Sequence, residues 1–250
     1  SLVPPEEEAL IHSFNETNRP YPETTVHGLF EEQAAKTPDQ EALRYNGVSW
    51  SYKKLNQRAN QIAHALREKG ARSDQITAVM LRRSMSTVAA LLGIWKSGSA
   101  YMPIDAEFPP ERISFLLRDS EASLLLTEKD LLPLIPPHFK GSVVIMEETV
   151  SQQTAPLPPV SDSGNWAYVI YTSGTTGVLV QHKAISNTLQ WRREEYGMTE
   201  GDIALHLFSY VFDGSLTSLF TPLLSGACVL LTDEDEAKDV LPIKQRIARH

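Results

Sequence analysis

Short apolar segments alternate with amphipathic segments along most of the chain, and this alternation limits the possible folds more than any other feature of the sequence. Runs such as 76–81, 100–104 and 123–127 are typical of short buried strands, whereas the helical segments between them place apolar residues on one face. A helix between two strands provides the long crossover that parallel strands require. The sequence therefore predicts an α/β fold with mostly parallel sheets flanked by helices.

One antiparallel hairpin is predicted near the start of this pattern. Segments 41–45 and 48–52 flank Asn46-Gly47, a dipeptide that favours a two-residue hairpin turn. Residues 1–24 are rich in Pro, Glu, Asn and Thr, which is typical of a linker or an extended strap. We therefore divide the chain into a linker at 1–24 and one domain at 25–250. The other predicted helices cover 26–34, 55–66, 84–96, 109–118, 182–196 and 215–224, and the other predicted strands cover 142–146, 166–171, 203–208 and 227–232.

Composition excludes several classes of function. The formal net charge is −8, which argues against a nucleic-acid or acidic-membrane binder, because such surfaces need clustered Lys and Arg. No apolar run approaches the roughly 20 residues that span a bilayer. The lone cysteine, Cys228, has no disulfide partner, and no histidine has a Cys or carboxylate at metal-ligand spacing. We expect a cytoplasmic protein without a metal site in this segment.

The stretch from Tyr171 to Gly177 has the residue types of a phosphate-binding loop. It reads Tyr-Thr-Ser-Gly-Thr-Thr-Gly and follows the predicted strand 166–171. Glycines let backbone amides approach an anion closely, and hydroxyls can donate to phosphate oxygens. It is not a Walker loop, because Gly177 is followed by Val178 and not by lysine. Composition alone favours the other interpretation, a flexible polar loop.

The exact string and two further stretches indicate a family. Tyr171–Gly177 resembles the phosphate-binding loop of adenylate-forming enzymes, and in particular of the adenylation domains of non-ribosomal peptide synthetases. Trp50–Leu55 is similar to the first core motif of that family, and Trp95–Asp105 is similar to the second. Neither motif carries obvious chemistry, so we expect both to have structural roles. The first would begin a helix, and the second would contain a helix that ends at a glycine and is followed by a strand. The resemblance, from about Tyr21 onward, implies the large N-terminal subdomain of the adenylate-forming fold, incomplete in this chain.

A fourth motif, Phe212-Asp213-Gly214-Ser215, precedes a predicted helix. From its position alone, Asp213 would simply cap that helix. The resemblance implies instead that Asp213 pairs with the ammonium of an amino-acid substrate and that Phe212 lies beside this substrate; a carboxylate is the natural partner of a partly desolvated ammonium. By the same resemblance, Gly214 and Thr217 line the substrate pocket. Gly214 leaves space and Thr217 is of modest size, so together they suggest a substrate with a large side chain. We expect tyrosine or another amino acid of similar size.

The loop departs from the family pattern after its second glycine. In the family a Pro-Lys-Gly stretch follows, whereas Gly177 here runs directly into Val178-Leu179-Val180. Either the sequence omits a loop tip that the protein carries, or the loop is truly shortened, which would impair ATP binding. The intact mass of the protein distinguishes the two. The loop residues that the resemblance implies for binding the triphosphate of ATP are Thr172, Ser173, Gly174, Thr175, Thr176 and Gly177.

The resemblance implies ATP-dependent activation of an amino acid as aminoacyl-AMP, with Mg²⁺, followed by loading onto the phosphopantetheine of a peptidyl carrier domain. A condensation domain would precede the linker. Adenylation domains are roughly twice as long as this chain, so the catalytic residues are expected beyond residue 250, and the 250 residues alone are expected to be inactive. Two alternatives stay open. One is an acyl- or aryl-CoA ligase of the same superfamily, in which Asp213 would have no ammonium to bind, and the other is a non-catalytic fragment.

Overall fold

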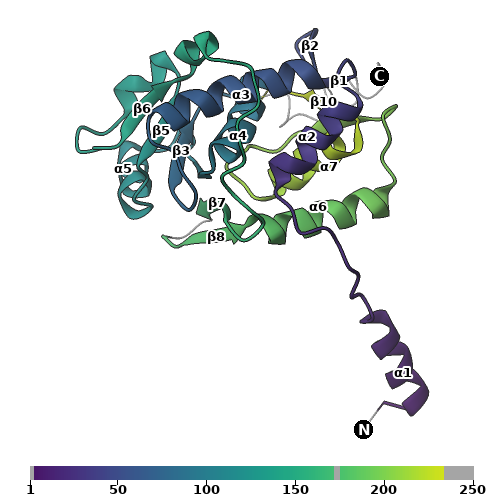
Figure 1. Ribbon diagram of the computed structural model, residues 1–250. Coiled ribbons are helices and arrows are strands. Elements are labelled where there is room, and N and C mark those ends of the chain that lie inside the picture. Colours follow the sequence, from purple (N-terminus) through teal and green to yellow (C-terminus); the bar gives the residue numbers. More distant parts are fainter. Residues whose placement is uncertain (1–2, 172–174, 234–250) are drawn as a thin grey trace.

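Two sheets form the frame of the molecule. The computed structural model describes residues 3–171 and 175–233. The six-stranded sheet has the order β6 (Ser142–Ile145), β5 (Leu124–Thr127), β3 (Ile76–Met80), β4 (Ala100–Pro103), β7 (Trp166–Tyr171) and β8 (Gly177–Gln181). The four-stranded sheet has the order β2 (Val48–Ser51), β1 (Glu41–Tyr45), β10 (Cys228–Leu231) and β9 (Ile203–His206). The two sheets and the helices around them are shown in Figure 1.

The prediction of mostly parallel sheets is confirmed. Neighbouring strands run parallel everywhere except at one edge of each sheet, where β1 pairs with β2 and β7 pairs with β8. The β1–β2 hairpin was predicted from Asn46-Gly47, and both residues have positive φ, as such a turn requires. Strand β8 was not predicted, because no two-residue turn signal marks the longer connection from β7 to β8.

Seven α-helices occur in the part of the chain that the structure describes. They are α1 (Pro5–Phe14), α2 (Val26–Lys36), α3 (Tyr52–Glu68), α4 (Met85–Ser97), α5 (Pro110–Asp119), α6 (His182–Tyr196) and α7 (Gly214–Ser225), with short 3₁₀ helices at Lys129–Leu134 and Met146–Ser151. Ser51 and Ser84 begin α3 and α4 by accepting hydrogen bonds from backbone N–H groups in the first turn. Gly98 and Gly226 end α4 and α7 in the left-handed conformation, which glycine adopts at little cost.

The core lies on both faces of the six-stranded sheet. The larger cluster of buried apolar residues joins the two sheets through α2, α3, α4, α6 and α7, and the smaller cluster packs α5 against the opposite face. Trp95 of α4 is central to the larger cluster. Its ring lies 4.8 Å from that of Phe220 in α7, and its Nε1 donates to the carbonyl of Ala167 in β7 at 2.7 Å. The Trp95 side chain of α4 therefore contacts both α7 and β7.

The first two family motifs have the structural roles that the sequence predicted. In the first, the Tyr52 hydroxyl lies 2.9 and 2.8 Å from the carbonyl oxygens of Leu223 and Ala227, so it fastens the start of α3 to the end of α7. In the second, the buried ammonium of Lys96 donates to the side chains of Asn56 and Asn60 at 2.7 and 2.9 Å, and to Glu31. Three hydrogen-bond acceptors compensate for the burial of this charge.

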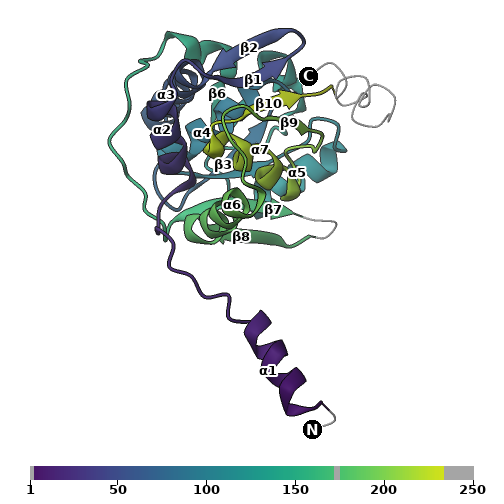
Figure 2. The ribbon, with the colours of Figure 1, turned by 90° about the vertical axis from the view of Figure 1, so that its right-hand side faces the viewer.

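The N-terminal segment differs from the linker that the sequence predicted, because it contains a helix. Pro5 occupies the first turn of α1, and Glu6, Glu7 and Glu8 follow it, which favours a helix N-terminus electrostatically. No residue of α1 is buried, and the helix projects away from the sheets (Figures 1 and 2). No helix in residues 3–171 or 175–233 is long and apolar enough to cross a bilayer.

Candidate functional site

The start of α7 presents the four residues predicted to hold an amino acid. Phe212 is 59% exposed, and Asp213 is exposed beside it at the N-cap of the helix. The Asp213 carboxylate accepts a hydrogen bond from the N–H of Gly214 at 2.8 Å, so the capping role that the sequence left open is present. Thr217 turns its hydroxyl back to the Gly214 carbonyl at 3.1 Å. A carboxylate has further acceptor positions, so this cap leaves room for an ammonium.

The charge of Asp213 acts on two tyrosines of the six-stranded sheet. Tyr101 of β4 and Tyr168 of β7 lie on neighbouring strands, with ring centroids 5.8 Å apart. Burial raises the pKa of both phenols, and the Asp213 carboxylate raises them further. The Tyr101 hydroxyl is buried without a hydrogen-bond partner among the described residues. Asp213 therefore lies close enough to β4 and β7 for its charge to influence the ionisation of both tyrosines.

Strand β7 leads directly into the predicted phosphate-binding loop. Thr172, Ser173 and Gly174 lie outside the described residues, whereas Thr175 and Thr176 are exposed. Gly177 begins β8 opposite Tyr171. A Cβ at Gly177 would lie 2.8 Å from the Tyr171 ring and 2.9 Å from Val169, so no larger residue fits there without movement.

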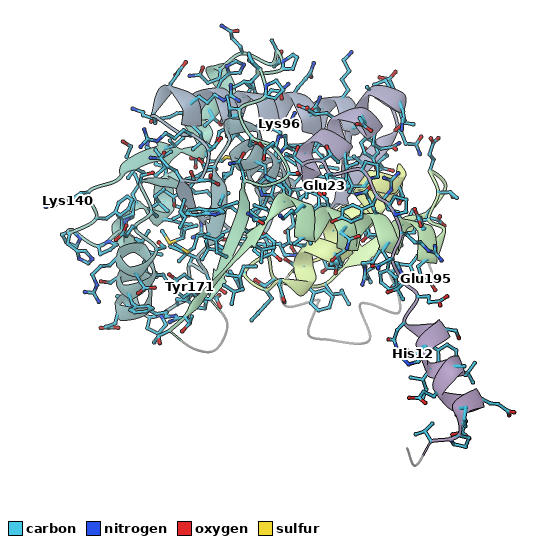
Figure 3. All side chains as sticks on the ribbon, turned by 60° about the horizontal axis from the view of Figure 1, so that its bottom comes forward. His12, Glu23, Lys96, Lys140, Tyr171 and Glu195 are labelled. Atoms are coloured by element: carbon cyan, nitrogen blue, oxygen red, sulfur yellow. The ribbon has the colours of Figure 1, made fainter. Side chains whose placement is uncertain are left out.

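Tyr171 is itself fixed by α5. Its hydroxyl donates to Asp119 at 2.7 Å, its ring meets the edge of Phe115 at 6.2 Å, and the Arg112 guanidinium lies 5.9 Å from its centroid. Figure 3 shows Tyr171 at the lower edge of the folded body in that view, well separated from Lys96. The entry to the loop therefore has a defined position relative to the sheet.

A cavity of about 360 Å³ opens where strands of both sheets end. Its walls include Arg83 after β3, Asp105 after β4, Tyr210 after β9 and Asp233 after β10. Ligands of α/β proteins commonly bind outside the carboxyl ends of such strands. Phe212 and Asp213 do not line this cavity, but Tyr210 belongs to the same loop.

No group of three His, Cys, Asp or Glu side chains in the described ranges is placed to bind a metal ion. Mg²⁺ bound together with a nucleotide takes many of its ligands from phosphate oxygens and water. The exposed hydroxyls of Thr175 and Thr176 at the carboxyl edge of the sheet fit an incoming triphosphate.

Four residues near this site were not identified from the sequence. Tyr101 and Tyr168 become neighbours only through the strand order β4–β7, and Arg83 and Tyr210 meet only where the two sheets adjoin. Nothing in a single sequence signals such pairs.

A sequence model of the AMP-binding enzymes matches residues 30–250. The chain belongs to this AMP-binding enzyme family. It is 62% identical over 256 residues to a plipastatin synthase protein of Bacillus subtilis (strain 168), a match that covers 100% of the chain and 10% of that protein. It is 45% identical over 258 residues to tyrocidine synthase 3 of Brevibacillus parabrevis, a match that covers 99% of the chain and 4% of that protein. The chain thus spans about a tenth of the first relative and less of the second.

Solved structures confirm the predicted fold class. The nonribosomal peptide synthetase FmoA3 superposes with a TM-score of 0.86 at 33% identity, over 91% of this chain and 25% of that chain, and it has also been solved with AMPPNP bound. An artificially fused adenylation–PCP di-domain from Klebsiella oxytoca superposes with a TM-score of 0.82 at 23% identity, over 91% of this chain and 43% of that chain, which shows the shared fold alone. The resemblance to adenylation domains that the motifs indicated is therefore confirmed.

The matched length exceeds the length of this chain. The match to the plipastatin synthase protein extends over 256 residues, whereas this chain has 250. That relative therefore carries extra residues within the matched span.

Proposed function

We propose that this chain is the part of an amino-acid-adenylating ligase that holds the amino acid and the triphosphate of ATP, and that the complete enzyme works in non-ribosomal peptide synthesis. The placement of Asp213 carries this proposal. Its carboxylate lies at the mouth of α7, and its charge reaches Tyr168 on the strand that leads to the Ser/Thr/Gly loop. Tyr168 precedes that loop by three residues, which is about 10 Å along a strand.

The described residues would contribute positioning and charge. Asp213 would accept the ammonium of the amino acid, with Phe212 beside it and with Gly214 and Thr217 along the side-chain pocket. The hydroxyls of the loop would donate to the phosphate oxygens. The substrate carboxylate would then attack the α-phosphorus while pyrophosphate leaves. Holding both reactants in line and neutralising phosphate charge account for most of the rate enhancement in such a reaction.

The finer parts of the proposal rest on the family and on composition. Tyrosine is the proposed substrate, because Gly214 and Thr217 leave room for a large side chain. Mg²⁺ would accompany ATP, a carrier domain would present its phosphopantetheine thiol, and a condensation domain would precede residues 1–24. A cytoplasmic location fits the single buried thiol of Cys228.

The test is amino-acid-dependent ATP–pyrophosphate exchange by the complete adenylation domain, measured with each common amino acid. We expect exchange with one or a few of them. Asp213→Ala should lower kcat/KM by about 100-fold or more, because the substrate ammonium loses its counter-charge. Asp213→Asn should lower it as well, although asparagine caps helices as effectively as aspartate and should preserve stability.

Asp202 provides a matched control. Its exposed carboxylate also accepts a backbone N–H, from Thr199 at 2.6 Å, but Asp202 lies before β9, beside the segment that follows the end of α7 and not at the start of that helix. Asp202→Ala should keep the exchange activity. Exchange with a fatty or aryl acid in place of any amino acid would move the enzyme to the acyl- or aryl-CoA ligases. The absence of exchange with every acid would support a non-catalytic protein.

A further inference from the structure

The loop 207–213 connects β9 to α7 and ends at Phe212 and Asp213. It makes a closed turn, because the N–H of Phe212 donates to the carbonyl of Ser209 at 3.2 Å, and α7 follows at once, with the N–H of Leu216 donating to the carbonyl of Asp213 at 3.0 Å. A displacement of the first half of the loop is therefore transmitted to Asp213. The four-stranded sheet holds that first half in place, and so do two contacts with segments that follow strands of the six-stranded sheet.

Arg83, three residues beyond the end of β3, provides one anchor. Its Nη1 donates to the carbonyls of Leu207 and Phe208, both at 3.1 Å, and its Nη2 donates to the carbonyl of His206. Three consecutive carbonyls thus converge on one guanidinium. The planar fork of arginine suits this arrangement, which the single ammonium of lysine cannot reproduce.

Tyr210 provides the other anchor. Its hydroxyl accepts a hydrogen bond from the N–H of Leu81 at 3.1 Å and lies 3.0 and 2.8 Å from the carbonyl oxygens of Leu81 and Ile104. A phenol has one proton, so it donates to one of these carbonyls at a time. Leu81 and Ile104 directly follow β3 and β4. One hydroxyl therefore fastens the loop to the ends of two neighbouring strands of the other sheet.

We infer that Tyr210 and Arg83 are positioning residues that fix the Asp213 carboxylate relative to the six-stranded sheet, and hence relative to the phosphate-binding loop. This inference rests on the proposed function, in which Asp213 binds the substrate ammonium. The two anchors tie the loop to β3 and β4, next to the strand that leads into the phosphate-binding loop. The relative placement of ammonium and triphosphate is thus set by contacts between the two sheets.

The experiment compares Tyr210→Phe with Tyr52→Phe in the complete adenylation domain. Both variants remove a phenol hydroxyl that bonds backbone groups, but Tyr52 holds the opposite end of α7, at Leu223 and Ala227. For Tyr210→Phe we expect the KM for the amino acid to rise about tenfold while the KM for ATP changes by less than about twofold. Tyr52→Phe should lower the thermal midpoint without changing either KM.

A second measurement asks whether Tyr210 acts through Asp213. The acid that lacks the α-amino group of the substrate serves as a competitive inhibitor, and it makes no bond to the ammonium site. Tyr210→Phe should leave its inhibition constant within about twofold of the parent value. Arg83→Lys, tested with the same two measurements, should likewise raise the KM for the amino acid while leaving the KM for ATP and the inhibition constant nearly unchanged. It takes the place of Tyr210→Phe if that variant does not fold.

Three results would overturn the inference: an unchanged amino-acid KM, equal changes in both KM values, or equal weakening of the amino acid and of its des-amino analogue. Failure of the proposed function looks different, because the parent domain itself would then show no exchange with any amino acid.

Discussion

His27 and His182 come from distant parts of the chain, yet their rings lie 5.3 Å apart in the core. The Nδ1 of His182 accepts a hydrogen bond from the N–H of Val26 at 3.4 Å, and the Nε2 of His27 lies 3.3 Å from the Thr25 hydroxyl. Burial lowers the pKa of His182 to about 4, although the nearby charge of Asp162 acts in the opposite direction. Burial, and then the proximity of His182, lowers the pKa of His27 well below its usual value.

Acid should therefore destabilise the protein. Between pH 6.5 and pH 4 an unfolded His182 binds a proton that the folded protein excludes, so stability is complete above pH 6.5 and falls as the pH decreases. At pH 5 the loss from His182 alone is about 2 kcal/mol. His182→Asn keeps an acceptor for Val26 but does not titrate, so urea unfolding of the complete domain at pH 7.5 and pH 5 should differ less in this variant. Equal pH dependence of stability in the parent and in His182→Asn would contradict the assignment.

At the scale of elements, the β7–β8 hairpin is held in a fixed position by the side chains around Gly177. The Tyr171 ring cannot easily move away from an added Cβ, because Asp119 and Phe115 hold it. Gly177→Ala should therefore displace the phosphate-binding loop and raise the KM for ATP about tenfold, with the KM for the amino acid unchanged. Exchange kinetics of the complete domain measure both values.

Gly201→Ala is the control for that substitution. A Cβ at Gly201 would meet only the Thr199 hydroxyl, at 4.0 Å, so this variant should behave as the parent does. An unchanged KM for ATP in Gly177→Ala would show that the close packing around this glycine is not needed for nucleotide binding.

The sequence predicted most elements because their boundaries are marked locally. Ser84 before α4, Gly98 after it and Asn46-Gly47 between β1 and β2 are signals that act within a few residues. Strand β8 was missed because it becomes a strand by pairing with β7, and its exposed Val178 and Leu179 give no alternating pattern. Helix α1 was missed because its composition resembles that of a linker.

The candidate site was predictable only in part, for a related reason. Motif resemblance indicated Asp213 and the residues around it, and the capping of α7 that the position of Asp213 predicted is present. Tyr210 and Arg83 could not be found in this way, since their partners are backbone groups of strands far away in the sequence. Every residue has a backbone carbonyl, so the residue type at the contacted position does not indicate that such a contact exists. The binding roles of the predicted site residues remain predictions: Thr172, Ser173, Gly174, Thr175, Thr176, Gly177, Phe212, Asp213, Gly214 and Thr217.

At the scale of the whole molecule, the chain meets the folded body between α1 and α2 and not at α1: Pro22 already accepts a hydrogen bond from Gln190 of α6 at 3.2 Å. The carbonyl of Thr24 accepts from Ser186 of α6 at 2.9 Å, and the Thr25 hydroxyl caps α2 by accepting from Gly28. Helix α1 has no buried residue, and its apolar Leu10, Ile11 and Phe14 are all more than half exposed. The boundary between residues 24 and 25 stays a prediction, and the Thr24 contact shows that the chain already meets α6 at the last residue before it.

Two truncations of the complete domain test that boundary. A chain that begins at Asn18 lacks α1 but keeps the contacts of Thr24 and Thr25, so its thermal midpoint and exchange rate should equal those of the parent. A chain that begins at Val26 loses the α2 cap and the bond to Ser186, at a cost of about 1–3 kcal/mol, and should melt several degrees lower. A large loss of stability on removing α1 alone would show that this helix packs on the rest of the domain. The linker would then have to be redrawn as part of the folded body.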